Sequence, residues 1–149
     1  MCRVNCLSRK FVCRVLVCKP CGLVYVGYTS QRVKERVSDH KAEFKRLVNL
    51  DKNDPKWHGG CEMAKHASKH HPEWVQSGKV VGWLRNVRCQ VLWVQADGQA
   101  LDPDGRVDSL KNAEAYWQGI LGSLHIGLNK RVEYNSAWRK NTAVDKHLR

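Results

Sequence analysis

Hydrophobic residues gather into two short runs near the start of the chain. Residues 11–18 (FVCRVLVC) and 23–28 (LVYVGY) are rich in β-branched and aromatic residues and are short enough to be strands. The connection at 19–22 (KPCG) supplies the proline and glycine that a tight turn needs. We therefore predict two antiparallel strands joined as a hairpin.

The next segment has the periodicity of an α-helix. Apolar side chains recur at roughly helical spacing, at Val33, Val37, Phe44, Leu47 and Val48. Charged residues fall between them, and the hydroxyl of Thr29 or Ser30 is a suitable N-cap. The pattern predicts a helix over about residues 30–48.

The middle of the chain is less regular. Residues 49–60 have the composition of a loop, and residues 61–71 favour a second helix that Pro72 ends. Residues 73–86 have no clear period, so their structure stays open.

The last third of the chain contains one more strand and one more helix. Residues 87–96 alternate as a third strand, which would place Val87, Cys89, Val91 and Trp93 on one face. Turns follow at 97–98 and 102–105, and a third helix is expected over about 107–121, ended by Gly122. Its expected apolar side consists of Leu110, Ala113, Tyr116, Trp117 and Ile120.

These elements define the expected fold class. The order is strand, strand, helix, helix, strand, helix and a short closing segment. This order favours an α+β fold with a small three-stranded antiparallel sheet flanked by helices. We expect one domain over residues 1–138, followed by a basic, flexible tail at 139–149.

Charge narrows the class of partner. The 149 residues include 26 Lys+Arg and 14 Asp+Glu, which gives a formal net charge of +12 and a pI of about 9.6. The hydrophobic fraction of 42% and the six tryptophans exclude a disordered basic tail. A globular domain with this charge attracts polyanions, with nucleic acid the first candidate and an anionic membrane surface the second.

Cysteine usage bears on the compartment and on metal binding. Seven cysteines, an odd number, with no secretion signal, predict an intracellular protein (cytoplasmic or nuclear) without a disulfide framework or a membrane span. Cys18-x-x-Cys21 and Cys2-x-x-x-Cys6 have the spacing of a Cys₄ zinc site, and unconnected thiols are the alternative. We interpret the group Cys61, His66, His70 and His71 as a polar helix face that approaches phosphate, and metal binding by His66 and His70, four residues apart, is the alternative.

Candidate chemistry resides in a few polar residues on these elements. Arg36 and His40 are four apart on the first helix and project from one face. Glu114 lies between two alanines on the third helix, and Tyr25 belongs to the second strand. A carboxylate for a metal ion, a guanidinium for phosphoryl oxygens and a phenol or imidazole for proton transfer are what phosphodiester hydrolysis requires.

The same residues resemble a known family. Val24-Tyr25-Val26-Gly27, followed by Thr29, Arg36 and His40, is similar to the second half of the GIY-YIG nuclease signature. Glu114-Ala115-Tyr116-Trp117 and Gly127-Leu128-Asn129 resemble the metal-binding glutamate and the later Gly-Leu-Asn element of that family. The resemblance covers about residues 11–130.

The resemblance implies a role for each matched residue. Tyr25 would lie near the nucleophilic water and the scissile phosphate, and Arg36 would stabilise the phosphoryl group. His40 matches a position that often transfers a proton. Glu114 would be the single ligand of Mg²⁺ or Mn²⁺, and Asn129 would support the site.

The first motif departs from the family pattern. Phe11-Val12-Cys13 stands where Gly-Ile-Tyr is expected, so Cys13 occupies the position of the first catalytic tyrosine. A thiol is shorter than a phenol and has an ordinary pKa of about 8.5, against about 10 for the phenol. The general base is therefore open among Tyr25, His40 and Tyr28.

The sequence thus predicts a metal-dependent endonuclease that hydrolyses DNA phosphodiester bonds. Because 149 residues leave no room for a second full domain, we expect a separate DNA-recognition protein or domain to supply selectivity. A cleavage-deficient nucleic-acid-binding module of the same fold is the alternative, and a zinc-stapled adaptor domain a more distant one.

Overall fold

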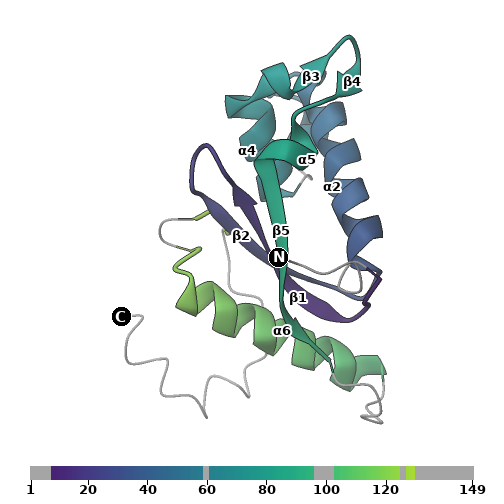
Figure 1. Cartoon of the computed structure of the whole chain (residues 1–149), viewed down its shortest axis with the longest axis vertical. Helices are drawn as coiled ribbons and strands as arrows, with labels where there is room; N and C mark the ends of the chain where they lie inside the picture. The colour runs from purple at the N-terminus through teal and green to yellow at the C-terminus, as the bar shows by residue number, and fades with distance from the viewer. Residues whose placement is uncertain (1–7, 59–60, 96–102, 125–126, 130–149) are drawn as a thin grey trace.

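A computed structural model describes residues 8–58, 61–95, 103–124 and 127–129 of the chain (Figure 1). The expected turn at 97–98 and the tail at 139–149 lie outside these ranges. The main elements are β1 (Val12–Cys18), β2 (Val24–Thr29), α2 (Val33–Val48), α3 (Pro55–His58), α4 (Glu62–His70), β5 (Val87–Val94) and α6 (Pro103–Ile120). Between α4 and β5 lie a 3₁₀ turn η1 (Pro72–Trp74), the two-residue strands β3 (Val75–Gln76) and β4 (Lys79–Val80), and α5 (Trp83–Asn86).

The central sheet has the strand order β2-β1-β5, and both strand pairs are antiparallel. The β1–β2 hairpin pairs Val12 with Thr29 through to Val17 with Val24. The expected α+β class and its three-stranded antiparallel sheet are confirmed. None of the described helices combines the length and the apolarity needed to cross a membrane.

The central strand β1 separates two cores, because its side chains alternate between the two faces of the sheet. Cys13 and Val15 pack with Val26 and with residues of α6 on one face. Leu16 and Cys18 pack with α2 and α4 on the other face. Figure 1 shows α6 on one side of the hairpin and α2 and α4 on the other.

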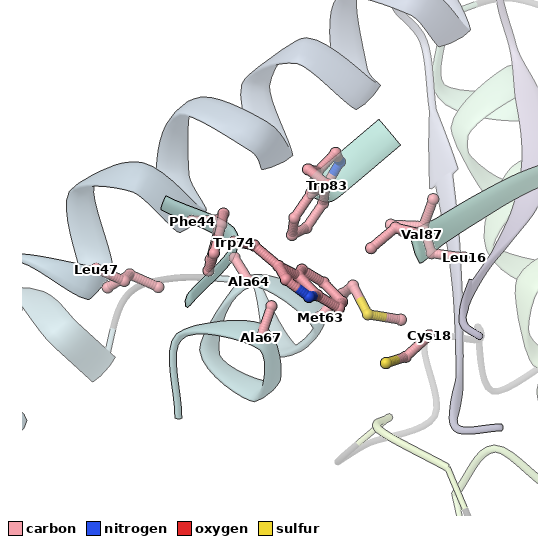
Figure 2. Packing of buried hydrophobic residues seen from close by; sticks show 10 residues of the cluster. All are labelled: Leu16, Cys18, Phe44, Leu47, Met63, Ala64, Ala67, Trp74, Trp83 and Val87. Atoms are coloured by element: carbon pink, nitrogen blue, oxygen red, sulfur yellow. The ribbon is translucent and has the colours of Figure 1, made fainter. Parts of the chain in front are cut away.

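The larger core is built on aromatic contacts (Figure 2). Phe44 of α2 stacks on Trp83 with 5.3 Å between ring centroids, and it meets Trp74 at 6.1 Å. These two tryptophans organise residues 73–86, for which the sequence pattern gave no prediction. Gly82 allows the packing, since a Cβ there would lie 2.5 Å from a ring carbon of Trp74.

A bulge in β5 corrects one prediction. Val87, Cys89 and Val91 face α2 and α4, as expected from their pairing with Cys18, Leu16 and Arg14. The register then shifts between Cys13 and Arg14, so that Trp93 pairs with Cys13 and packs on the α6 face. One extra residue reverses the alternation of a strand.

Two helix boundaries and one helix face also differ from expectation. The hydroxyl of Thr29 accepts a hydrogen bond from the backbone N–H of Gln31, ahead of α2, and Glu35 accepts one from the N–H of Arg32. The helix therefore begins at Val33. The segment 102–105 is not a turn throughout, because α6 begins at Pro103; proline suits the first turn of a helix, where its missing N–H costs no bond.

The buried stripe of α6 is partly polar. Leu110, Glu114 and Gln118 follow one another at four-residue intervals and are all buried. Tyr116 and Ile120, expected on the apolar side, are 44% and 59% exposed. The buried side of α6 therefore includes Glu114 and differs from the purely apolar side that the sequence predicted.

The closing segment 127–129 extends the free edge of β2. The N–H of Leu128 donates to the carbonyl of Val24 at 2.8 Å. The side chain of Asn129 accepts from the N–H of Val26 and donates to its carbonyl, both at 2.8 Å. Gly127 makes this approach possible, because a Cβ there would lie 2.6 Å from the Val24 carbonyl oxygen. The Gly-Leu-Asn element thus replaces a fourth strand.

Substitution of Asn129 by alanine should lower the free energy of unfolding by roughly 1–3 kcal/mol, because the buried N–H and carbonyl of Val26 both lose their partner. Urea denaturation measures the change, with Asn53→Ala as the control at an exposed asparagine. Equal midpoints for Asn129→Ala and the wild type would contradict this role.

Candidate functional site

Tyr25 and His40 meet on the α2 side of the sheet. Tyr25 pairs with Leu16 across the hairpin, so its side chain shares that face. The rings of Tyr25 and His40 approach edge to face, with centroids 6.3 Å apart and an interplanar angle of 81°. Gly27 leaves room for the phenol, since a Cβ there would lie 3.1 Å from Cε1 of Tyr25.

Arg36 lies one helical turn before His40 on α2. Its side chain is 38% exposed and forms an ion pair with Asp39 at 3.8 Å. Arg36 also lies within electrostatic range of Tyr25 and His40, where its charge lowers the pKa of both groups. It is therefore a solvent-facing guanidinium beside the two rings, suited to an anionic ligand.

The Tyr25 hydroxyl keeps its proton at neutral pH. Burial raises the pKa of Tyr25 to about 12, and the nearby charges of Arg14 and Arg36 offset this only in part. A phenol in this state donates a hydrogen bond more readily than it accepts a proton.

His40 is fully buried and is held in one protonation state. Burial first, and then the charges of Arg14 and Arg36, lower the pKa of His40 to about 3. Nη2 of Arg14 lies 2.7 Å from Nε2 of His40. Because a guanidinium offers only donors, Nε2 accepts this bond and Nδ1 carries the imidazole proton.

Glu114 lies on α6, which packs against the face of the sheet opposite to Tyr25 and His40. Its side chain is 4% exposed, and its charge raises the pKa of both Cys13 and Tyr25. A carboxylate within electrostatic range of Tyr25 is an oxygen ligand of the type that Mg²⁺ or Mn²⁺ prefers. The other members of the site are arginines, a phenol and an imidazole whose lone pair is engaged, so Glu114 is the fitting ligand among them.

Cys13 points away from Tyr25 and His40. It is fully buried with Val15 and Val26 on the α6 face, and burial raises the pKa of its thiol to about 12. Arg14, the next residue, takes the place on the Tyr25 side of the strand. The sequence-based search missed Arg14, although a lone arginine inside an apolar strand was a visible signal.

Of the residues expected in the site, the structure brings Tyr25, Arg36 and His40 together and places Glu114 within electrostatic range. Asn129 lies behind them, bonded to the backbone of β2 at Val26, where it positions the strand that carries Tyr25.

A second cluster lies at the other end of the same face. One sulfur or nitrogen atom from each of Cys18, Cys21, His66 and His71 lies within 4.8 Å of every other. Nε2 of His71 is 3.4 Å from Sγ of Cys18 and 3.1 Å from Sγ of Cys21. The His71 ring stacks on Trp74 with centroids 4.3 Å apart and an interplanar angle of 3°.

This cluster differs from the zinc site that the sequence suggested. Cys18 and Cys21 belong to it, whereas Cys2 and Cys6 lie outside the described residues. His66 is 8% exposed, so it does not form part of a solvent-facing helix surface as expected. The second histidine of the cluster is His71, at the cap of α4, whereas His70 contacts the His66 ring but lies outside the cluster. Only the packing of α4 against the hairpin brings the two pairs together.

The donor set fits tetrahedral zinc. Two thiolates and two imidazoles around Zn²⁺ are about 3.3–3.8 Å apart, given metal–ligand lengths of about 2.0–2.3 Å. Cys-x₂-Cys and His-x₄-His are spacings typical of structural zinc sites. With four protein ligands, such a site is closed to substrate.

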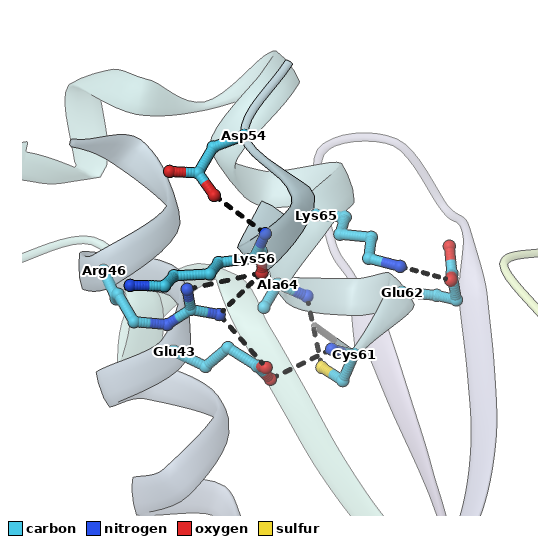
Figure 3. A network of polar contacts seen from close by, with 8 residues as sticks. All are labelled: Glu43, Arg46, Asp54, Lys56, Cys61, Glu62, Ala64 and Lys65. Atoms are coloured by element: carbon cyan, nitrogen blue, oxygen red, sulfur yellow. Dashed lines mark hydrogen bonds and ion pairs between the residues drawn. The ribbon is translucent and has the colours of Figure 1, made fainter. Parts of the chain in front are cut away.

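A third group consists of His40, Glu43 and Cys61, and one potential ligand atom of each lies within 4.8 Å of the others. The polar atoms of Glu43 and Cys61 form hydrogen bonds within the protein. The Glu43 carboxylate accepts a hydrogen bond from the N–H of Cys61 at 3.0 Å, and the Cys61 sulfur accepts one from the N–H of Ala64 at 3.3 Å (Figure 3). The Cys61 side chain thus caps α4. Since Nδ1 of His40 carries a proton, it has no lone pair for a metal ion.

Comparisons with known proteins add no relative. No protein-family model matches this chain, and no match to it is found among the curated proteins or the solved structures. A proposal of function therefore rests on the residues of the two clusters and on their geometry.

Proposed function

We propose that this protein is a GIY-YIG-like endonuclease that hydrolyses phosphodiester bonds of DNA with Mg²⁺ or Mn²⁺. The observation that carries the proposal is the convergence of Tyr25, His40 and Arg36 from β2 and α2, with the Glu114 carboxylate within electrostatic range. These groups come from distant parts of the chain, and they are the residue types that stabilise a phosphoryl transition state.

Each side chain has a task that its environment suits. Arg36, partly exposed, binds the non-bridging oxygens of the phosphate. The Tyr25 hydroxyl, which stays protonated, donates a hydrogen bond to the phosphate or orients the attacking water. Glu114 would hold the cation, which supplies stabilisation of the charge that develops on the phosphate and the leaving oxygen.

The net charge of +12 supports a nucleic-acid substrate. A positive field raises the local concentration of a polyanion and makes binding weaken as salt increases. The described part of the chain contains one catalytic-type cluster and no second unit for sequence recognition, so a separate DNA-recognition protein or domain is the proposed partner.

Replacement of Glu114 by glutamine should slow Mg²⁺-dependent nicking of supercoiled plasmid by roughly 10²–10³-fold while DNA binding persists, since the metal ligand is lost. Asp108→Asn is the matched control, because Asp108 is an exposed carboxylate on the same helix. Gel assays with and without Mg²⁺ or Mn²⁺ measure the rates. Plasmid binding without metal-dependent nicking by the wild type would favour the cleavage-deficient module instead.

A second function belongs to the cysteine–histidine cluster. We propose that Cys18, Cys21, His66 and His71 hold a structural zinc ion that ties the β1–β2 turn to α4. The observation that favours it is the mutual approach of four ligand atoms within 4.8 Å, drawn from two elements separated in sequence. The ion would stabilise the packing of α4 against the sheet and leave the chemistry to Tyr25 and Arg36.

The purified protein should contain about one zinc ion per chain, as a four-ligand site binds one ion. His71→Gln should lose most of this zinc and lower the unfolding temperature. His70→Gln should retain both, because the neighbouring His70 is exposed and outside the cluster. Elemental analysis and thermal unfolding measure these changes, and a folded protein free of zinc would rule out the proposal.

A further inference from the structure

Arg14 is a buried charge with unmet hydrogen-bond capacity. It lies on the central strand β1 and is 1% exposed. Its Nη2 donates to His40, whereas its Nε and Nη1 have no partner in the part of the chain that the structure describes. Within the residues that the structure describes, Arg14 also forms no ion pair with a carboxylate. Fold stability does not explain such a residue, because a buried charge without an anion is unfavourable.

The surroundings of Arg14 are those of the candidate site. Arg14 pairs with Gly27 on β2 and with Val91 on β5. Gly27 carries no side chain, and the ring of Tyr25 lies over it. The charges of Arg14 and Tyr25 act on each other: the guanidinium lowers the pKa of the phenol, although burial has the larger effect. Arg14 therefore lies directly behind Tyr25, the residue that we propose contacts the phosphate.

We propose that Arg14 is a positioning residue of the site: it holds His40 as the Nδ1–H tautomer and places a fixed positive charge behind Tyr25, where the phosphate binds. The second half of this statement rests on the proposed nuclease function. The first half depends only on the 2.7 Å contact between Nη2 and Nε2.

The contact assigns His40 a different role from the one the family resemblance implies. The only lone pair of a neutral imidazole is engaged by Arg14, so His40 is not the acceptor of the proton from water. Its Nδ1–H is a donor that has no hydrogen-bond partner in the part of the chain that the structure describes. His40 is therefore held neutral beside Tyr25, and the anion at Tyr25 is stabilised by Arg14 from behind and by Arg36 from the solvent side.

The groups that face His40 keep it neutral over a wide pH range. They are Arg14 from β1, Tyr25 from β2, Arg36 and Glu43 from α2, and Cys61 from the cap of α4. Burial and the two arginines lower the pKa of His40, and the single carboxylate does not outweigh them. His40 should not titrate between pH 5 and pH 8.

The tautomer is measured by two-bond ¹H–¹⁵N correlation NMR of the His40 ring in the full chain. The wild type should show the Nδ1–H pattern, unchanged from pH 5 to pH 8. Arg14→Lys should keep this pattern, because the ammonium group still donates to Nε2, and Arg14→Met should lose it. An Nε2–H pattern in the wild type would overturn the inference whether or not the protein cleaves DNA.

Activity and stability separate a positioning role from a structural one. Arg14→Met and Arg14→Gln should slow nicking at least about tenfold, with Arg14→Lys intermediate, and should unfold at or above the wild-type temperature. Arg88→Met, an exposed arginine on β5, controls for the loss of one charge. Loss of stability in Arg14→Gln, or wild-type nicking by Arg14→Met, would overturn the inference. If the wild type does not nick DNA, the proposed nuclease function fails while the NMR result still decides the role of Arg14 toward His40.

Discussion

The alternation of side chains along the central strand β1 is the constraint on which the rest of the structure depends. Cys13 and Val15 point to α6 and complete an apolar core with Val26. The other face presents Arg14, Leu16 and Cys18 in succession. Arg14 faces the candidate site, Leu16 enters the aromatic core and Cys18 belongs to the cysteine–histidine cluster. One strand thus sets the positions of a polar site, a core and the cysteine–histidine cluster along the same side of the sheet.

This arrangement gives the two polar clusters different physical characters. The cluster of Cys18, Cys21, His66 and His71 brings four potential metal ligands together between the hairpin turn and α4. The site around Tyr25 and His40 is positively charged in its interior, because Arg14 is buried without a described carboxylate partner and Arg36 lies at the surface.

Local signals were sufficient for the hairpin and for the long helix α2. Their residues combine β-propensity or helical spacing with turn residues and caps nearby, so each element is favoured by its own segment. Residues 73–86 had no such signal, because Trp74 and Trp83 take their positions from Phe44, far away in the sequence. The position of Trp93 was predicted on the wrong face, since a one-residue bulge arises from pairing with β1 and leaves no mark on the alternation itself.

The sequence by itself determined the fold class and the basic character, because composition and periodicity are properties of the chain itself, and the resemblance to the nuclease signature pointed to Tyr25, Arg36, His40 and Glu114 as candidate residues. Only the tertiary structure decided that Arg14, not Cys13, faces His40, and that His66 and His71 join Cys18 and Cys21. The physical reason is the same in both cases. The face of a strand to which a side chain points, and the helix that meets it there, depend on strand register and on packing between segments that lie far apart in the chain.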